Sequence, residues 1–408
     1  MELALQSKDI TATLVCIGKF HLFALARELL KKDMLERIFS GYPSWKLQDE
    51  DIPPERLESF PWLQTPYMAL GKWGMLGDGR FQRELAWHVH ETLDRHVARH
   101  LPDSDVLFAL SSSGLACGRE AQKRGAKYIC DRGSSHIRYQ DAILREEFSR
   151  WGETFAGIDP RVIAKEESEY EAADLVTVPS TFVYRSFLKM GVPESKLRKV
   201  PYGADVRRFE KVTDPAPDTF DVLFVGQVAF QKGLPDLIEA FQLFKHPKKR
   251  LRIVGGMRPE MARYLKNHRV PDHVEFLGHI PQPELKHIMS QSHVMVLPSI
   301  QEGLALVQAQ ALACGCTVIG TSNTGAEDLF TDGKEGFIVS IRNPQAIADK
   351  LVLLADDPYR RAAMSEAALQ LVKALGGWTE YGNQMAEVLR ELVDGEDRIS
   401  GKRPVVEK

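Results

Sequence analysis

The sequence predicts an α/β protein built from two doubly wound domains with parallel sheets. Short apolar runs alternate with longer amphipathic ones along nearly the whole chain. This alternation is typical of parallel strands joined by crossover helices. The predicted strands are too many for one comfortable sheet. A turn- and proline-rich stretch between Gly203 and Phe220 is therefore expected to separate two domains.

The individual elements follow in chain order. The strands predicted in the first half are Thr13–Ile17, Ile38–Ser40, Val106–Leu110, Lys127–Cys130 and Leu175–Val178, and the helices between them include Leu22–Lys32, Phe81–His100, Leu115–Arg124 and Ile137–Arg150. The second half repeats the rhythm with strands Val222–Val225, Leu251–Val254, Val274–Leu277, Val294–Leu297, Val318–Thr321 and Phe337–Val339. The predicted domains are residues 1–203 together with a terminal helix at 377–395, and residues 204–376. A charged tail at 396–408 is expected to be disordered.

Composition limits the classes of protein. The 408 residues carry a formal net charge of only −3, with 44% hydrophobic residues, as in a globular protein without a nucleic-acid footprint. No apolar run reaches the roughly 20 residues of a membrane span. The start of the chain is too charged for a signal peptide. The five cysteines show no zinc spacing and are odd in number, so we expect reduced, mostly buried thiols and a cytoplasmic protein.

The segment from Ser299 to Thr321 is the most informative stretch of the chain. An apolar strand leads into an acidic-glycine turn at Glu302-Gly303, a small-residue helix follows, and Gly315 ends it before the next strand. This order puts Glu302 and the first amides of the helix at a carboxyl edge, where open α/β sheets bind ligands. Free amides and the helix dipole favour phosphate there.

A second loop, from Gly226 to Gly233, also follows a predicted strand and opens a helix. Its glycines let a phosphate approach the backbone, and Lys232 supplies a cation on a flexible stem. The loop is not a Walker A motif, because no Gly-Lys-Ser/Thr occurs in the chain. The plainer interpretation is an ordinary helix start with a solvated lysine.

Together these motifs resemble glycosyltransferase family 4, which comprises retaining enzymes of the GT-B fold. Glu302-Gly303 and the polar Gln310 eight residues after Glu302 resemble its E-x7-E region, and residues 226–233 resemble its G-R-x5-K-G loop. Gln310 and Gln227 stand where the family has a glutamate and an arginine. The resemblance implies two Rossmann-like domains facing across a cleft, with a C-terminal helix crossing back to the first domain. The Trp378–Tyr381 pair resembles that crossing.

The resemblance also implies a reaction and a set of roles. The reaction is metal-independent, retaining transfer of a hexose from a nucleotide sugar, UDP-linked as in UDP-glucose, to a glycan, a lipid-linked glycan or another hydroxyl acceptor. No cofactor is expected. Gly18, Lys232, Leu306 and Val307 would hold the diphosphate; Glu302, Gly303, Leu304 and Ala305 the sugar; His279 and Ile280 the base; and Gln310 the ribose.

The loop Asp131–His136 of the first domain follows a predicted strand and would face the cleft. The family commonly has a histidine here that contacts the donor sugar, and His136 is the nearest match. Arg132 is the alternative cleft residue, since it could face the phosphates and offset the missing charge at Gln227. A lone histidine is also often a satisfied core group. Residues 111–114 are candidates for the acceptor side.

Several other patterns favour plain interpretations. Asp49-Glu50-Asp51 and Asp103-Ser104-Asp105 mimic a D-x-D metal motif but are predicted to be solvated turns, the second lying at the wrong end of its strand. His96 and His100 have metal-binding spacing. With no third ligand evident beyond Asp94 or Glu91, they predict a polar helix face. The aromatic stretch at 60–77 predicts a packed loop and short helix; a peripheral contact with the inner face of the membrane is the alternative.

Two other functions remain open at this point. One is a GT-B nucleotide-sugar epimerase, which would act without an acceptor. The other is a glycan-binding or regulatory relative with weakened catalysis. Gln227 and Gln310 favour the regulatory protein, whereas the joint presence of Glu302 and Lys232 argues against it.

Overall fold

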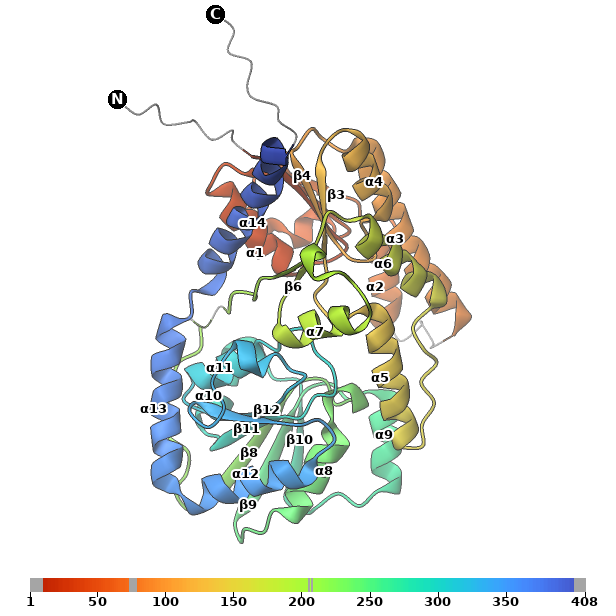
Figure 1. Ribbon diagram of the computed structural model, residues 1–408. Coiled ribbons are helices and arrows are strands. Elements are labelled where there is room, and N and C mark those ends of the chain that lie inside the picture. Colours follow the sequence, from red (N-terminus) through yellow and green to blue (C-terminus); the bar gives the residue numbers. More distant parts are fainter. Residues whose placement is uncertain (1–9, 73–78, 205, 207, 400–408) are drawn as a thin grey trace, which may run out of the picture.

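The computed structural model describes residues 10–72, 79–204, 206 and 208–399. It contains two parallel sheets stacked one above the other in Figure 1. The seven-stranded sheet has the order β3-β2-β1-β4-β5-β6-β7, and the six-stranded sheet has the order β10-β9-β8-β11-β12-β13. The strand order reverses beside the first strand of each sheet, as in doubly wound folds. The predicted fold class is therefore confirmed.

The first sheet and its helices span residues 12–199. The strands are β1 (Ala12–Cys16), β2 (Leu35–Ser40), β3 (Leu57–Ser59), β4 (Val106–Leu110), β5 (Lys127–Asp131), β6 (Leu175–Val178) and β7 (Leu197–Lys199), and the helices are α1 (His21–Leu30), α2 (Gln64–Lys72), α3 (Arg80–His100), α4 (Leu115–Lys123), α5 (Ile137–Arg150), α6 (Pro160–Ala172) and α7 (Thr181–Lys189). Every residue of β1 is buried, as expected for a strand covered on both faces. The sequence missed β3 and β7, because three residues at a sheet edge show no periodicity.

The second sheet begins after the Gly203–Phe220 stretch. Its strands are β8 (Phe220–Val225), β9 (Lys249–Val254), β10 (Val274–Gly278), β11 (Val294–Leu297), β12 (Thr317–Thr321) and β13 (Gly336–Val339), and its helices are the short 3₁₀ helix η5 (Phe230–Lys232), α8 (Leu234–Leu243), α9 (Pro259–Asn267), α10 (Gln282–Ser290), α11 (Val307–Ala313), α12 (Pro344–Asp356) and α13 (Pro358–Ala374). All six strands were predicted, because each contains a short run rich in apolar residues between turns, even though β10 at the sheet edge is largely exposed.

The chain crosses back to the first domain through α14 (Gly377–Ile399). This helix lies beside α1 in Figure 1 and buries Tyr381, Met385 and Leu389 in the first domain's core. A Cβ placed on Gly203 would lie 2.4 Å from the Gly377 carbonyl oxygen, so the two connections between the domains touch. The predicted terminal helix continues past residue 395 to Ile399, and residues 400–408 of the predicted tail lie outside the described residues.

Helix α5 forms a second link between the domains. It runs down from the first domain to the side of α9 in Figure 1. Arg150 pairs with the buried Asp236 of α8 at 2.7 Å, and Arg342 of the second domain pairs with Glu147 at 2.7 Å. The ring of Phe148 meets Phe230 of η5 edge-on, with centroids 5.1 Å apart. The first domain therefore packs directly on the short helix that carries Lys232.

Two expectations drawn from the composition concern the state of the cysteines and membrane-spanning segments. All five cysteines are free and buried, and burial raises the pKa of the Cys16 thiol to about 12, which keeps it protonated. Within the described ranges, no helix has both the length and the apolar character to cross a bilayer.

Candidate functional site

Lys232 and Glu302 meet at the carboxyl edge of the second sheet. Lys232 ends η5, which follows β8, and Glu302 lies in the loop that follows β11. The Lys232 ammonium forms an ion pair with the Glu302 carboxylate, and the Ser299 hydroxyl donates to the same carboxylate oxygen at 2.9 Å. The two side chains are 21% and 14% exposed. Two residues that the sequence placed in one ligand site, 70 positions apart, are thus in contact and reachable from solvent.

The backbone between Gly303 and Val307 forms a tight turn into α11. The Ala305 amide donates to the Thr324 carbonyl at 3.0 Å, and the Leu306 amide donates to the Leu304 carbonyl at 3.0 Å. These two amides are therefore engaged by the protein, contrary to the expectation that they are open to a ligand. The amides of Gly303, Leu304 and Val307 have no hydrogen-bond acceptor within the part of the chain that the structure describes.

A buried glutamine fixes this turn. Gln308 is fully buried, and its amide group donates to the carbonyls of Ala305 and Thr324. Its amide oxygen accepts from the Thr324 hydroxyl at 3.2 Å. These bonds tie the turn before α11 to the loop after β12, so the open amides hold one orientation. The sequence analysis missed Gln308, because a polar side chain inside a small-residue helix carries no sign of its partner.

The first domain closes directly over the Glu302 loop. The Ser180 hydroxyl donates to the Gly303 carbonyl at 2.6 Å. A Cβ on Gly303 would lie 1.9 Å from the Gly133 carbonyl oxygen, so only glycine fits between the domains here. The buried Gln301 side chain donates to the hydroxyls of Ser134 and Ser135, at 2.6 and 3.1 Å. The 131–136 loop, which was predicted to face the cleft, therefore contacts the Glu302 loop through Gly133 and the two serines.

His136 does not make that contact. Its ring nitrogen Nδ1 caps α5 by accepting from the Arg138 amide, and its ring packs against Tyr170 and Phe187 at 5.0 Å. Burial lowers the pKa of His136 to about 4, which keeps the ring neutral. His136 also lines a pocket of about 340 Å³ with Tyr170 of α6 and with Lys196, in the segment that follows α7. Its expected place in the cleft is corrected, because capping and core packing determine where the ring points.

Arg132 is likewise turned into the first domain. Its guanidinium pairs with the buried Glu166 at 2.9 Å and also donates to Gln140, Ser111 and the Ser135 carbonyl. It is 8% exposed. The expectation that Arg132 offsets the missing charge at Gln227 is corrected for this arrangement, since a carboxylate from α6 already neutralises it. Nothing in the sequence indicated this partner, which lies 34 positions away.

A polar cluster that includes His21 lies at the carboxyl ends of β1, β5 and β6. His21 Nε2 lies 2.7 Å from Asp131 Oδ2, and the Thr177 hydroxyl donates to Asp131 Oδ1 at 2.7 Å. The Tyr202 ring packs against His21, with centroids 4.1 Å apart and ring planes tilted by 30°. The Tyr202 hydroxyl is buried without a partner in the described structure, and a Cβ on Gly133 would approach it to 2.8 Å. The cluster therefore packs against the turn at Gly133, the same turn that meets Gly303.

Of the remaining predicted donor residues, Gly18, Gln227, His279 and Ile280 lie in loops that follow strands, and Gln310 lies in α11. Gln227 and His279 are exposed, Ile280 and Gln310 are partly exposed, and Gly18 is buried. A Cβ on Gly18 would lie 2.8 Å from the ring of Phe20, which is 51% exposed and free to turn aside. Their contacts with a nucleotide stay predictions.

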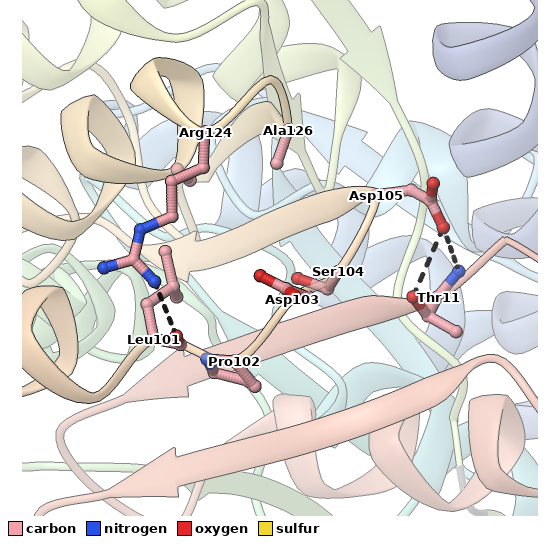
Figure 2. A pocket seen from close by; sticks show the side chains of 9 residues that line it. Thr11, Leu101, Pro102, Asp103, Ser104, Asp105, Arg124 and Ala126 are labelled. Atoms are coloured by element: carbon pink, nitrogen blue, oxygen red, sulfur yellow. Dashed lines mark hydrogen bonds between the residues drawn. The ribbon is translucent and has the colours of Figure 1, made fainter.

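The two segments that mimic a D-x-D motif were both predicted to be solvated turns, and the structure agrees with this for only one of them. Asp103, Ser104 and Asp105 line a pocket of about 280 Å³ before β4, where Asp105 accepts from Thr11 (Figure 2). This is the amino edge of the sheet, as expected. Glu50, by contrast, is buried and pairs with Lys19 and Arg27, so the prediction of a solvated turn was wrong for it.

The 111–114 loop, expected on the acceptor side, is enclosed by carboxylates. The amides of Ser112 and Gly114 donate to Glu169 at 2.6 and 2.9 Å. The Ser112 hydroxyl donates to Glu166. Burial, with a further contribution from Glu166, raises the pKa of Glu169 to about 8. These amides and this hydroxyl are therefore occupied by the protein itself, and an acceptor role for the loop stays a prediction.

Comparison with known proteins supports the same class of fold. The solved structures it resembles include sucrose-phosphate synthase from Thermosynechococcus elongatus, with a TM-score of 0.68 at 20% identity over 95% of this chain and 100% of that one. Another is Anabaena HepE in complex with UDP and glucose, with a TM-score of 0.66 at 15% identity over 93% of this chain and 99% of that one. The fold is that of the GT-B glycosyltransferases.

At the level of sequence, a family model matches most of the second domain. Residues 205–371 match the model of the family described as glycosyl transferases group 1. A GDP-mannose-dependent phosphatidylinositol monomannoside mannosyltransferase of Mycolicibacterium smegmatis is 29% identical over 53% of this chain, and a related mannosyltransferase of Corynebacterium glutamicum is 27% identical over the same share. This chain covers 62% of the length of each. These similarities relate the chain to glycosyltransferases.

Proposed function

We propose that the protein is a retaining glycosyltransferase that transfers a hexose from a nucleotide sugar to a hydroxyl acceptor without a metal ion. The observation that carries the proposal is the contact of Lys232 with Glu302 at the carboxyl edge of the second sheet, directly beneath the 131–136 loop. One cation, one carboxylate and the open amides of the Glu302 loop suit a sugar diphosphate. The match of residues 205–371 to group 1 glycosyl transferases supports the same assignment.

In this proposal Lys232 moves from Glu302 to the diphosphate when the donor binds. Its ammonium would then stabilise the charge that develops on the departing phosphate, as a cation placed beside a leaving group does. Glu302, released from the ion pair, would accept hydrogen bonds from sugar hydroxyls. The acceptor would attack on the leaving-group face, and the departing phosphate would take its proton. Contact between Gly133 and Gly303 would keep water from the donor.

Two observations bear on the donor. A UDP-linked sugar is our first choice, and the resemblance of the fold to a protein bound to UDP and glucose is in keeping with it. The relatives named as GDP-mannose-dependent favour GDP-mannose as the second candidate. The acceptor we propose is a glycan or lipid-linked glycan. Five free, buried thiols favour a reducing compartment and thus the cytoplasm.

A panel of nucleotide sugars, incubated with the protein without acceptor, tests this function. Slow hydrolysis of one donor is expected for a transferase. Isomerisation of the sugar would instead identify an epimerase, and neither binding nor turnover would identify a regulatory protein. The active donor should give the largest rise in thermal midpoint. EDTA should leave turnover unchanged, and strict dependence on a divalent metal would contradict the proposed roles of Lys232 and the amides.

A further inference from the structure

A cluster of possible metal ligands lies in the first domain and is unrelated to the residues assigned above. It consists of His96 and His100, one turn apart near the end of α3, and Glu58 in the middle of β3. One ligand atom from each residue lies within 4.8 Å of the other two. His96 Nε2 is already 2.8 Å from the Glu58 carboxylate. The sequence offered the two histidines but gave no reason to choose Glu58, 38 positions away.

We propose that Glu58, His96 and His100 form a binding site for a divalent transition-metal ion, with Zn²⁺ as the best match. Imidazole nitrogens and a carboxylate oxygen are ligands that zinc accepts, at about 2.0–2.2 Å. Tetrahedral ligands at that radius lie about 3.4 Å apart. The His96 and His100 rings are stacked with centroids 4.2 Å apart, so the exposed His100 ring would turn for both imidazole lone pairs to point at one ion. An oxygen-seeking ion such as Mg²⁺ or Ca²⁺ is a poor match to two imidazoles.

The surroundings of the cluster orient its ligands. His100 Nδ1 lies 2.8 Å from the His96 carbonyl oxygen. Because a carbonyl only accepts, Nδ1 carries the proton, and the Nε2 lone pair of neutral His100 is left for a metal. The His96 ring stacks on Phe60 with centroids 4.2 Å apart, which restricts its rotation. To bind a metal through Nε2, neutral His96 would carry its single proton on Nδ1, so the proton that now lies between Nε2 and Glu58 would move to Nδ1 by exchange with solvent.

A hydrogen bond from a neighbouring strand also fixes the Glu58 carboxylate. Arg37 of β2 donates to Glu58 Oε2 at 3.1 Å, while Oε1 faces His96. This leaves one oxygen for a metal, as in monodentate coordination. Outer contacts that fix a ligand in this way are a common part of metal sites. With three protein ligands and an exposed His100, a fourth position would be open to water.

The site would act as a clamp within the first domain. β3 is the edge strand of the sheet and only three residues long. A metal bound to Glu58 and to both histidines would tie this edge to α3. Lys232 and Glu302 belong to the other domain, so metal binding here is independent of the metal-free transfer reaction proposed above.

The test is a calorimetric titration of untagged, EDTA-stripped protein with ZnCl₂. We expect one Zn²⁺ per chain, together with a rise in thermal midpoint. His100→Ala alters only an exposed side chain and leaves the fold intact, yet should weaken binding by roughly tenfold to a hundredfold. Glu58→Gln should weaken it similarly. His88→Ala, an exposed histidine on the same helix, is the matched control and should bind as the wild type does.

The visible spectrum of the Co²⁺-substituted protein provides a second test of which atoms bind the metal. Its visible spectrum should indicate nitrogen and oxygen ligands without a thiolate charge-transfer band, because all five cysteines are buried. The proposal is overturned if the wild type binds less than one equivalent of Zn²⁺, if His100→Ala binds as tightly as His88→Ala, or if a thiolate band appears. UDP binding by His100→Ala should equal that of the wild type.

Discussion

The ion pair between Lys232 and Glu302 makes opposite predictions for its two members. In the absence of donor, the Glu302 carboxylate holds the ammonium that we assign to the diphosphate. Glu302→Gln should therefore bind UDP more tightly than the wild type, because it removes a competing anion. The same variant should transfer sugar more slowly, because the carboxylate that holds the sugar hydroxyls is lost. Lys232→Ala should weaken UDP binding and slow transfer together.

The expected change in UDP affinity can be worked out for each variant from the interaction that it removes. Both side chains are partly exposed, and such ion pairs contribute about 0.2–1 kcal/mol. Releasing Lys232 should then tighten UDP binding by roughly 1.5- to 5-fold. A hydrogen bond to a charged group contributes about 1.5–3 kcal/mol, so Lys232→Ala should weaken UDP binding by roughly 10- to 150-fold. In Lys232→Ala, the loss of transition-state stabilisation for sugar transfer should be about 2–4 kcal/mol.

Isothermal titration with UDP would test the two predicted changes in affinity, and initial-rate measurements with the active donor would test the predicted loss of transition-state stabilisation. Lys286→Ala is a matched control, since Lys286 is 27% exposed, lies in the same domain and pairs with Glu210 at 2.9 Å. It should leave UDP affinity and turnover unchanged. If Lys232→Ala binds UDP within twofold of the wild type, Lys232 does not contact the diphosphate and the assigned site is wrong. A weaker affinity in Glu302→Gln would contradict the competition between carboxylate and phosphate.

Three further predictions concern the ribose, the domain contact and pH. Gln310→Leu should weaken UDP binding by about 1–2 kcal/mol by stranding ribose hydroxyls, and Gln310→Glu should bind at least as well as the wild type; an unchanged affinity in Gln310→Leu would remove Gln310 from the site. Gly303→Ala places a Cβ 1.9 Å from the Gly133 carbonyl oxygen, so turnover should fall by about tenfold to a hundredfold with UDP affinity retained. Gly256→Ala, where a Cβ meets no atom within 4 Å, should have no effect. The pKa of Glu169 is raised from 4.5 to about 8; its contribution to folding stability is therefore full below pH 4.5 and lost as pH rises through 8. The thermal midpoint of the wild type should thus fall relative to that of Glu169→Gln from pH 5 to pH 9, and a constant difference would refute the raised pKa.

The sequence alone determined the class of fold and the placement of the central motifs. Every strand of the second sheet was predicted, because each contains a short run rich in apolar residues between turn residues, as is usual in parallel sheets covered by helices. Lys232 and Glu302 could be placed at one carboxyl edge for the same reason, since parallel strands bring their following loops together. The three-residue edge strands β3 and β7 could not be predicted, because pairing with a neighbour defines them rather than any pattern of their own.

Tertiary structure decided which side chains reach the candidate site. His136 and Arg132 belong to the right loop, yet the first caps α5 beside Tyr170 and the second is neutralised by Glu166. The two serines between them meet Gln301 instead. In the same way, Glu58 joins His96 across 38 positions. A local pattern records burial and turns along the chain, whereas the direction of a polar side chain depends on the partner that folding brings to it.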